Sequence, residues 1–160
     1  MSISQVVNLV IRSNDKYANF LKKDVKFIKS LEAPLLTDQV FTVVSILNNL
    51  VGNSLEAIST KGIIEIGGLL KGENLCLWVK DNGSGISQDK KDIIFDPGYT
   101  TKFSDVGVPS SGMGLSQVKM LVEKLNGEVK LAPTPTNEAK NLTGACFSVN
   151  IPIKNLMKGD

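Results

Sequence analysis

The stretch DNGSGI, residues 81–86, places one carboxylate and two glycines directly after the apolar run LCLWV. Asp-Asn-Gly and Ser-Gly are ordinary turn sequences, because glycine adopts positive φ at no steric cost. The chemical alternative is a flat ligand: Asp81 accepts a hydrogen bond from an exocyclic amine while Gly83 and Gly85 let the backbone approach it. Taken alone the stretch favours a turn, because short glycine motifs often match by chance.

A second pair of candidate residues, Asn49 and Asn53, is spaced four apart in an apolar-periodic segment predicted to be a helix over 37–59. This spacing puts both amides on one helical face. Asparagine is a poor helix-interior residue, and Gly52 between them costs about 1 kcal/mol relative to alanine. The pair belongs either to a solvated face or to a pocket, where amide oxygens ligate Mg²⁺ and amide nitrogens donate to phosphate.

Two further stretches have side chains or backbone suited to phosphate. In SSGMGLSQV, residues 110–118, Gly112 and Gly114 precede a predicted helix, so free N–H groups and the positive end of the helix dipole converge there. A flexible loop that meets a helix gives the same pattern. It is neither a Walker A loop, since no Lys-Ser/Thr follows, nor a Rossmann fingerprint, since the third glycine is missing. In FDPGYTTK, residues 95–102, Lys102 follows two threonines, although taken alone the stretch favours a surface lysine on a loop.

The elements that must position these residues follow from periodicity and turn signals. Helices are expected over 4–22, 37–59 and 115–126, the last closed by Gly127, and strands over 25–31, 62–70, 74–80, 128–132 and 145–152. A short amphipathic piece covers 88–95. The connection 97–112 has no periodicity and is expected to be a lid, a binding loop or disordered. This order predicts a mixed sheet with helices on one face.

Composition excludes several classes of function. The 160 residues, 42% hydrophobic and 21% charged, are typical of one globular domain, and a net charge of +2 favours no nucleic-acid or membrane partner. No apolar segment approaches the roughly 18 residues that span a bilayer. Cys76 and Cys146 are expected as buried free thiols in a reducing compartment. The absence of histidine excludes Ser-His-Asp and Cys-His catalysis and histidine-ligated metals.

In order, NNLVGNSLEA, DNGSGI, IFDPGYTTK, SGMGLSQVK and GACFSVNIP resemble the N, G1, F and G2 boxes and the closing strand of the histidine-kinase-type ATP-binding domain. This is the GHKL superfamily, which includes gyrase-type topoisomerases, heat-shock chaperone ATPases and mismatch-repair ATPases. The resemblance covers about residues 37–153, and residues 4–31 resemble the family's lead-in helix and first strand. It implies the Bergerat fold, an α+β two-layer sandwich with a mostly antiparallel sheet. The expected division is a lead-in helix over 1–22, an ATP-binding catalytic domain over 23–155 and a tail over 156–160.

The resemblance also implies roles for single residues. Asn53 would ligate Mg²⁺, Asn49 would help to hold metal or phosphate, and Asp81 would accept from the adenine amine. Asn49 and Lys102 are the catalytic candidates. The ATP-binding set comprises Asn49, Asn53, Asp81, Gly83, Gly85, Ile86, Phe95, Thr101, Lys102, Gly112, Met113, Gly114 and Leu115. The chain departs from the family pattern at Ser54, where alanine is usual, and at Ala145, where many members have a threonine near adenine.

Asn49 stands where hydrolysing relatives have a glutamate that activates water, and an amide cannot act as a general base. The resemblance therefore implies a sensor histidine kinase fragment that transfers the γ-phosphoryl group of Mg·ATP to a histidine on a separate dimerisation domain. As an isolated fragment it is expected to be monomeric, cytoplasmic, slow in turnover and only indirectly connected to a response regulator. The alternatives are a stand-alone serine kinase of the anti-sigma-factor type and a nucleotide-binding module without catalysis. The lead-in helix and the TTK sequence favour the sensor kinase.

Overall fold

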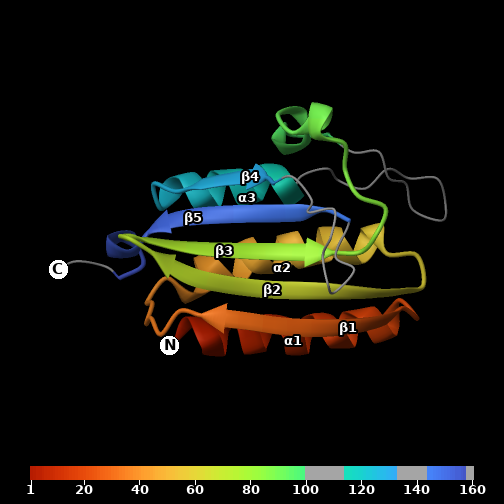
Figure 1. Cartoon of the computed structure of the whole chain (residues 1–160), viewed down its shortest axis with the longest axis horizontal. Coiled ribbons are helices and arrows are strands. Elements are labelled where there is room, and N and C mark those ends of the chain that lie inside the picture. Colours follow the sequence, from red (N-terminus) through yellow and green to blue (C-terminus); the bar gives the residue numbers. More distant parts are fainter. Residues whose placement is uncertain (100–113, 133–143, 158–160) are drawn as a thin grey trace.

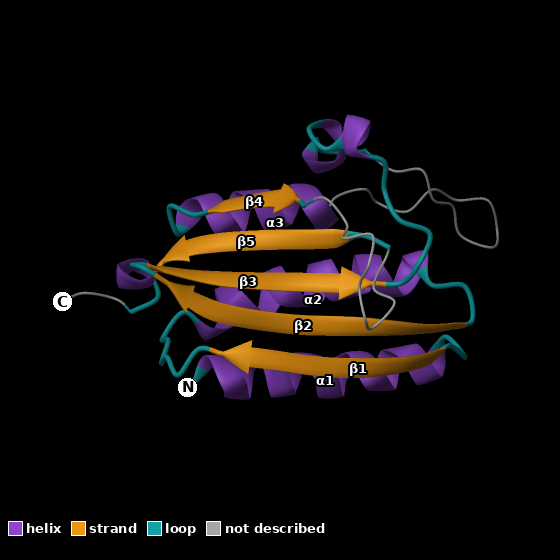
Figure 2. Cartoon of the chain, in the orientation of Figure 1, coloured by secondary structure: helices purple, strands orange, loops and turns teal. Residues whose placement is uncertain are grey.

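Three helices cover one face of a five-stranded sheet in the computed structural model, which describes residues 1–99, 114–132 and 144–157 (Figure 1). Along the chain, helices and strands alternate up to the hairpin of residues 61–81, as Figure 2 shows. Their bounds are α1 Ile3–Phe20, β1 Asp24–Glu32, α2 Val40–Ala57, β2 Lys61–Lys71, β3 Asn74–Asp81, α3 Gly114–Lys124, β4 Glu128–Leu131 and β5 Cys146–Pro152. Short 3₁₀ turns are η1 Gln88–Lys90, η2 Ile93–Phe95 and η3 Ile153–Asn155.

The strand order across the sheet is β1-β2-β3-β5-β4. β1 and β2 run parallel and are joined through α2, whereas β2–β3, β3–β5 and β5–β4 are antiparallel pairs. This arrangement confirms the predicted α+β class, with a mixed and mostly antiparallel sheet and its helices on one face. β3 is therefore an interior strand, with a partner on each side and its last residue, Asp81, at the carboxyl end.

The core lies between the sheet and the helices. On β3 the side chains of Leu75, Leu77 and Val79 are fully buried against the helices, as the strand alternation predicts. Cys76 and Trp78 point to the other face and are half-buried. Both cysteines are free; Cys146 is buried as expected, but the expectation was wrong for Cys76, because the outer face of the sheet stays partly open around it.

α1 is part of this core. It begins with a capping box in which Ser2 and Gln5 exchange hydrogen bonds, and it buries Val6 and Val10 among others. Its buried Asn14 donates to the backbone carbonyl of Val10 and, at 2.9 Å, to Oδ1 of Asn48 on α2. The lead-in helix is thus joined to the helix that carries the asparagine pair.

Most helix ends differ from the sequence prediction by one to three residues, and two of them have a structural reason. α2 begins at Val40 and not at residue 37, because Thr37 is buried and its hydroxyl donates at 2.6 Å to the carbonyl of Leu156, a fully buried residue near the end of the chain. After α3 the positive φ is adopted by Asn126, at 59°, and not by Gly127. Gly127 is needed for another reason: a Cβ there would collide with the carbonyl oxygen of Asn150 on β5.

No helix among the described residues is both long enough and apolar enough to cross a bilayer.

Candidate functional site

Asp81 is a fully buried carboxylate at the end of the central strand. It shares the helix-facing side of β3 with the buried leucines, so its carboxylate lies inside the two-layer structure. Its Oδ1 accepts hydrogen bonds from the backbone N–H groups of Gly83, at 2.8 Å, and Ala145, at 3.2 Å. A buried carboxylate requires such donors, and they fix its orientation.

The glycines that follow Asp81 are required for two different reasons. A Cβ on Gly83 would lie 2.6 Å from the carbonyl oxygen of Ala57, so only glycine fits against the end of α2. The next residue, Ser84, donates its N–H to that same carbonyl at 3.1 Å. Gly85 has a φ of +79°, a left-handed conformation that favours glycine. The turn interpretation and the ligand interpretation of this stretch are therefore compatible.

Gly144 is a site residue that the sequence analysis did not single out. Its N–H donates at 2.8 Å to the carbonyl of Asp81, and a Cβ on it would collide with Oδ1 of Asp81. Gly144 is the first residue of the stretch GACFSVNIP, but a lone glycine before a strand does not indicate contact with a carboxylate that is far away in the sequence. The wall beside Asp81 is thus formed by backbone at Gly144 and Ala145.

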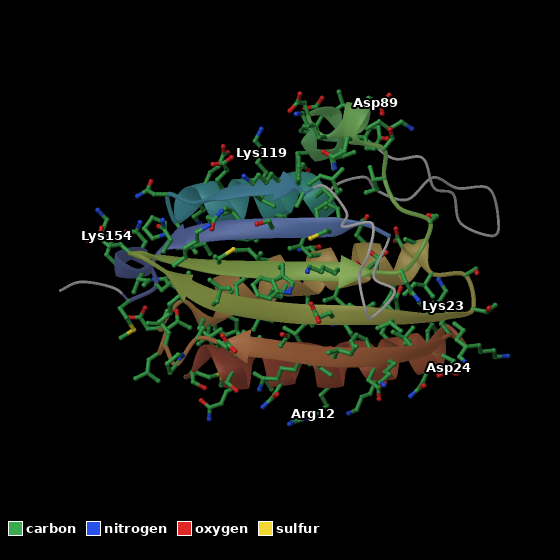
Figure 3. The ribbon with its side chains drawn as sticks, viewed as in Figure 1. Arg12, Lys23, Asp24, Asp89, Lys119 and Lys154 are labelled. Atoms are coloured by element: carbon green, nitrogen blue, oxygen red, sulfur yellow. The ribbon has the colours of Figure 1, made fainter. Side chains whose placement is uncertain are left out.

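Ile86 and Phe95 connect this end of the domain to the core. Phe95 is buried at the end of η2, where its ring meets Phe147 of β5 edge-to-face with centroids 6.4 Å apart. Ile86 is half-buried and packs against the same core. In Figure 3 the neighbouring Asp89 lies on the short turns away from the sheet, so the piece 88–95 is amphipathic as expected.

Asn49 lies next to the start of α3. Its Nδ2 donates at 2.8 Å to the carbonyl of Ser45, and its Oδ1 is 3.6 Å from the position that a Cβ on Gly114 would occupy. The first residue of α3 therefore lies against Asn49, although the two stretches are far apart in sequence. Leu115, which follows, is half-buried against the core. The N-terminus of α3 and the Asn49 amide of α2 therefore lie side by side.

Asn53 is half-buried one helical turn after Asn49. Because Ala57, one further turn along, contacts Gly83, the amide pair and Asp81 lie at the same end of the domain. Figure 1 shows this end of α2 behind the arrowhead of β3, away from the labelled N-terminus. Amide oxygen is a ligand type that suits Mg²⁺, so the residues present fit a hard cation.

Four of the residues expected in the site lie outside the described part of the chain: Thr101, Lys102, Gly112 and Met113. The described remainder comes from α2, the end of β3 and the loop after it, η2 and the start of α3. One part of the site has the buried Asp81 carboxylate, surrounded by close-packed backbone. The other part has the asparagine amides of α2, beside the N-terminus of α3. This arrangement can bind a flat base with an amine at one end and an anion with its cation at the other.

Comparison with known proteins assigns the chain and its fold to a family. The profile of the family described as histidine kinase-, DNA gyrase B-, and HSP90-like ATPase matches residues 38–155. The chain belongs to this family. The relatives that match it from end to end are sensor histidine kinases, so it corresponds to the ATP-binding catalytic domain of that branch.

Two sensor histidine kinases and one solved catalytic domain illustrate the similarity. Sensor histidine kinase GlnK of Bacillus subtilis is 38% identical over 99% of this chain, and ZraS of Escherichia coli K12 is 26% identical over 100% of it. The chain spans only 37% and 32% of these two proteins. The catalytic domain of histidine kinase ThkA, in a nucleotide-free form, superposes with a TM-score of 0.75 at 19% identity, over 99% of this chain and 97% of that one.

Proposed function

We propose that this domain binds Mg·ATP and transfers its γ-phosphoryl group to a histidine on a separate helical dimerisation domain of the same kinase. The observation that carries the proposal is the buried Asp81 carboxylate, fixed by the N–H groups of Gly83 and Ala145 beside a glycine loop. Such a carboxylate can select a base that carries an exocyclic amine. The ATP site would face the cytoplasm, where the nucleotide and a response regulator are available.

The phosphates would lie between the amide pair and the start of α3. Asn53, assisted by Asn49, would hold Mg²⁺ through amide oxygen, and the ion would neutralise charge on the phosphoryl oxygens. Backbone N–H groups at the start of α3 would donate to phosphate, supported by the helix dipole. Gly112, Met113, Thr101 and Lys102 are proposed to complete this half of the site.

Asn49 supports transfer to a protein nucleophile and not a dedicated hydrolase. Its amide lies beside Gly114, at the proposed phosphate end, and an amide cannot remove a proton from water at neutral pH. Phosphoryl transfer requires mainly positioning and electrostatic stabilisation. The chain contains no histidine, so the nucleophile has to come from another domain.

The test is incubation with γ-labelled ATP, Mg²⁺ and an isolated helical hairpin that carries the phosphoacceptor histidine of the parent kinase. Acid-labile, base-stable label on that hairpin supports the proposal, and a His→Ala hairpin is the matched control. Label that appears as acid-stable phosphoserine on an antagonist protein would assign the domain to the serine kinases. Tight Mg·ATP binding with no transfer to any hairpin would assign it to binding modules without catalysis.

A further inference from the structure

One polar side chain belongs to the buried face of α1, a helix that lies wholly among the described residues. The buried side chains of α1 are Ile3, Val6, Val7, Val10, Asn14 and Ala18. The helix packs against α2 behind the sheet (Figure 1). Apolar contacts have no preferred direction, so they alone leave two packed helices free to rotate against each other. One buried polar residue in an apolar helix interface can remove that freedom and fix the register.

The amide of Asn14 forms a bridge between the two helices. Its Nδ2 donates at 2.8 Å to the carbonyl of Val10, one turn earlier on α1, and at 2.9 Å to Oδ1 of Asn48 on α2. The first bond holds the side chain to its own helix, and the second crosses to the neighbouring helix. Both donor hydrogens of the amide are therefore used. Because hydrogen bonds are directional, this bridge fixes the position of Asn48 relative to α1.

Asn48 directly precedes Asn49, and successive residues of a helix point about 100° apart. The side-chain oxygen of Asn48 meets α1, whereas that of Asn49 lies beside Gly114 at the start of α3. The amide of Asn49 is itself held to α2, because its Nδ2 donates at 2.8 Å to the carbonyl of Ser45. The rotation of α2 about its axis, fixed by α1 at residue 48, therefore decides where the Asn49 oxygen lies.

The narrow tolerance of a metal site makes this rotation important. Side-chain ends lie about 5–6 Å from a helix axis, so a rotation of about 10–20° moves an amide oxygen by about 1–2 Å. Binding groups have to stay within about 0.5 Å of their working positions. Asn53, one turn after Asn49, would move in the same sense. A bond that fixes α2 at residue 48 thus preserves the geometry of both proposed ligand residues.

We propose that Asn14 is a positioning residue for the Mg·ATP site, which acts through Asn48 to hold α2 at the rotation that the amide pair requires. The inference rests on the proposed function and deepens it, because it gives the lead-in helix a part in metal binding. Replacement of Asn14 should therefore reduce the gain in ATP affinity that Mg²⁺ produces. The ATP affinity measured without Mg²⁺ should not change, because it depends on Asp81 of β3.

The experiment measures ATP affinity by calorimetric titration, with and without Mg²⁺, in wild type, Asn14→Leu, Asn48→Ala and the double variant. In each single variant the gain from Mg²⁺ should fall by about 3- to 30-fold, the range for residues that affect a site without contacting its ligand. The double variant should lose no more than the larger single loss, because both changes break the same bond. Asn48→Ala breaks that bond from its half-buried end, so the test does not depend on whether Asn14→Leu folds.

Val7→Ala is the matched control for a change in stability alone. Val7 is fully buried on the same helix, and its truncation destabilises the domain without removing the amide bridge. Its urea midpoint should fall, while its gain in ATP affinity from Mg²⁺ should equal that of wild type. An unchanged gain in Asn14→Leu and Asn48→Ala would overturn the inference, as would an equal loss of the gain in Val7→Ala. A wild-type domain that binds no ATP, or binds it independently of Mg²⁺, would instead count against the proposed function.

Discussion

Oδ1 of Asn49 lies 3.6 Å from the point at which a Cβ on Gly114 would stand. The contact joins the middle of α2 to the first residue of α3, two segments that the sequence separates by the whole hairpin and its following loop. The contact shows how the proposed phosphate end is built: the N-terminus of α3 lies on one side, and the amide pair of α2 lies on the other. The purine end, at Asp81, is built from different elements.

Asp81→Asn should weaken ATP binding by about 10- to 100-fold, the range for a lost hydrogen bond to a charged group. The amide keeps one oxygen for the N–H groups of Gly83 and Ala145, but it presents an NH₂ where the carboxylate would accept from adenine. Calorimetric titration with ATP measures the loss. Asp89→Asn, on the exposed turn labelled in Figure 3, is the control and should bind like wild type. Unchanged affinity in Asp81→Asn would remove this residue from the site.

Mg²⁺ increases ATP affinity in the proposed site, and this gain should be at least about 10-fold smaller in Asn53→Ala than in wild type. Losses of this size are common even for residues that only support the metal ligands. Binding without Mg²⁺ should change little, because the amide is proposed to act through the ion. Asn8→Ala removes an exposed amide from α1 and should leave the Mg²⁺ dependence intact. If Asn53→Ala and wild type respond equally to Mg²⁺, the metal assignment is wrong.

Two glycine-to-alanine substitutions should have opposite effects on the free energy of unfolding. Gly83→Ala should lower it by about 1–3 kcal/mol, because the new methyl group would lie 2.6 Å from the rigid backbone carbonyl of Ala57. Gly52→Ala should raise it by about 1 kcal/mol, because its Cβ meets nothing within 4 Å and alanine favours the helix. Urea denaturation of both variants measures the difference. Equal effects would show that the loop does not rest on α2 as described.

Cys146 should make the folded domain less stable at alkaline pH. Burial raises the pKa of its thiol above the ordinary value of 9.0, Lys80 opposes that rise, and Asp81 adds to it. The unfolded chain therefore loses this proton first, so the free energy of unfolding falls as pH rises through 9 toward the folded-state pKa. Urea denaturation between pH 7 and 10 should show a smaller decline for Cys146→Ala than for wild type. If Cys146→Ala retains the wild-type decline, the thiol makes no such contribution.

The sequence predicted the elements well because their signals are local. Alternation along Leu75, Leu77 and Val79 assigned both the strand and its buried face, and helical periodicity located α1, α2 and α3 to within a few residues. The interior position of β3 also followed from the apolar character of its two faces. These features depend only on neighbours along the chain, which the sequence displays.

What the sequence could not supply were contacts between distant segments. The bond from Thr37 to Leu156 replaced an expected helix start, and it exists only because the end of the chain returns to the beginning of α2. Gly144 touches Asp81 only because β5 pairs with β3 in one register. The sequence also did not show that the buried Ser54 hydroxyl has no hydrogen-bond partner among the described residues, because a serine in an apolar-periodic helix is compatible with an exposed or a bonded side chain.

A crystal structure of the domain with Mg²⁺ and a non-hydrolysable ATP analogue tests the central claim most directly. The account predicts one bound nucleotide, with the adenine amine within hydrogen-bond distance of Asp81 and the ion coordinated by Asn53. A nucleotide that binds with its base away from Asp81, or a metal held by other side chains, would contradict it.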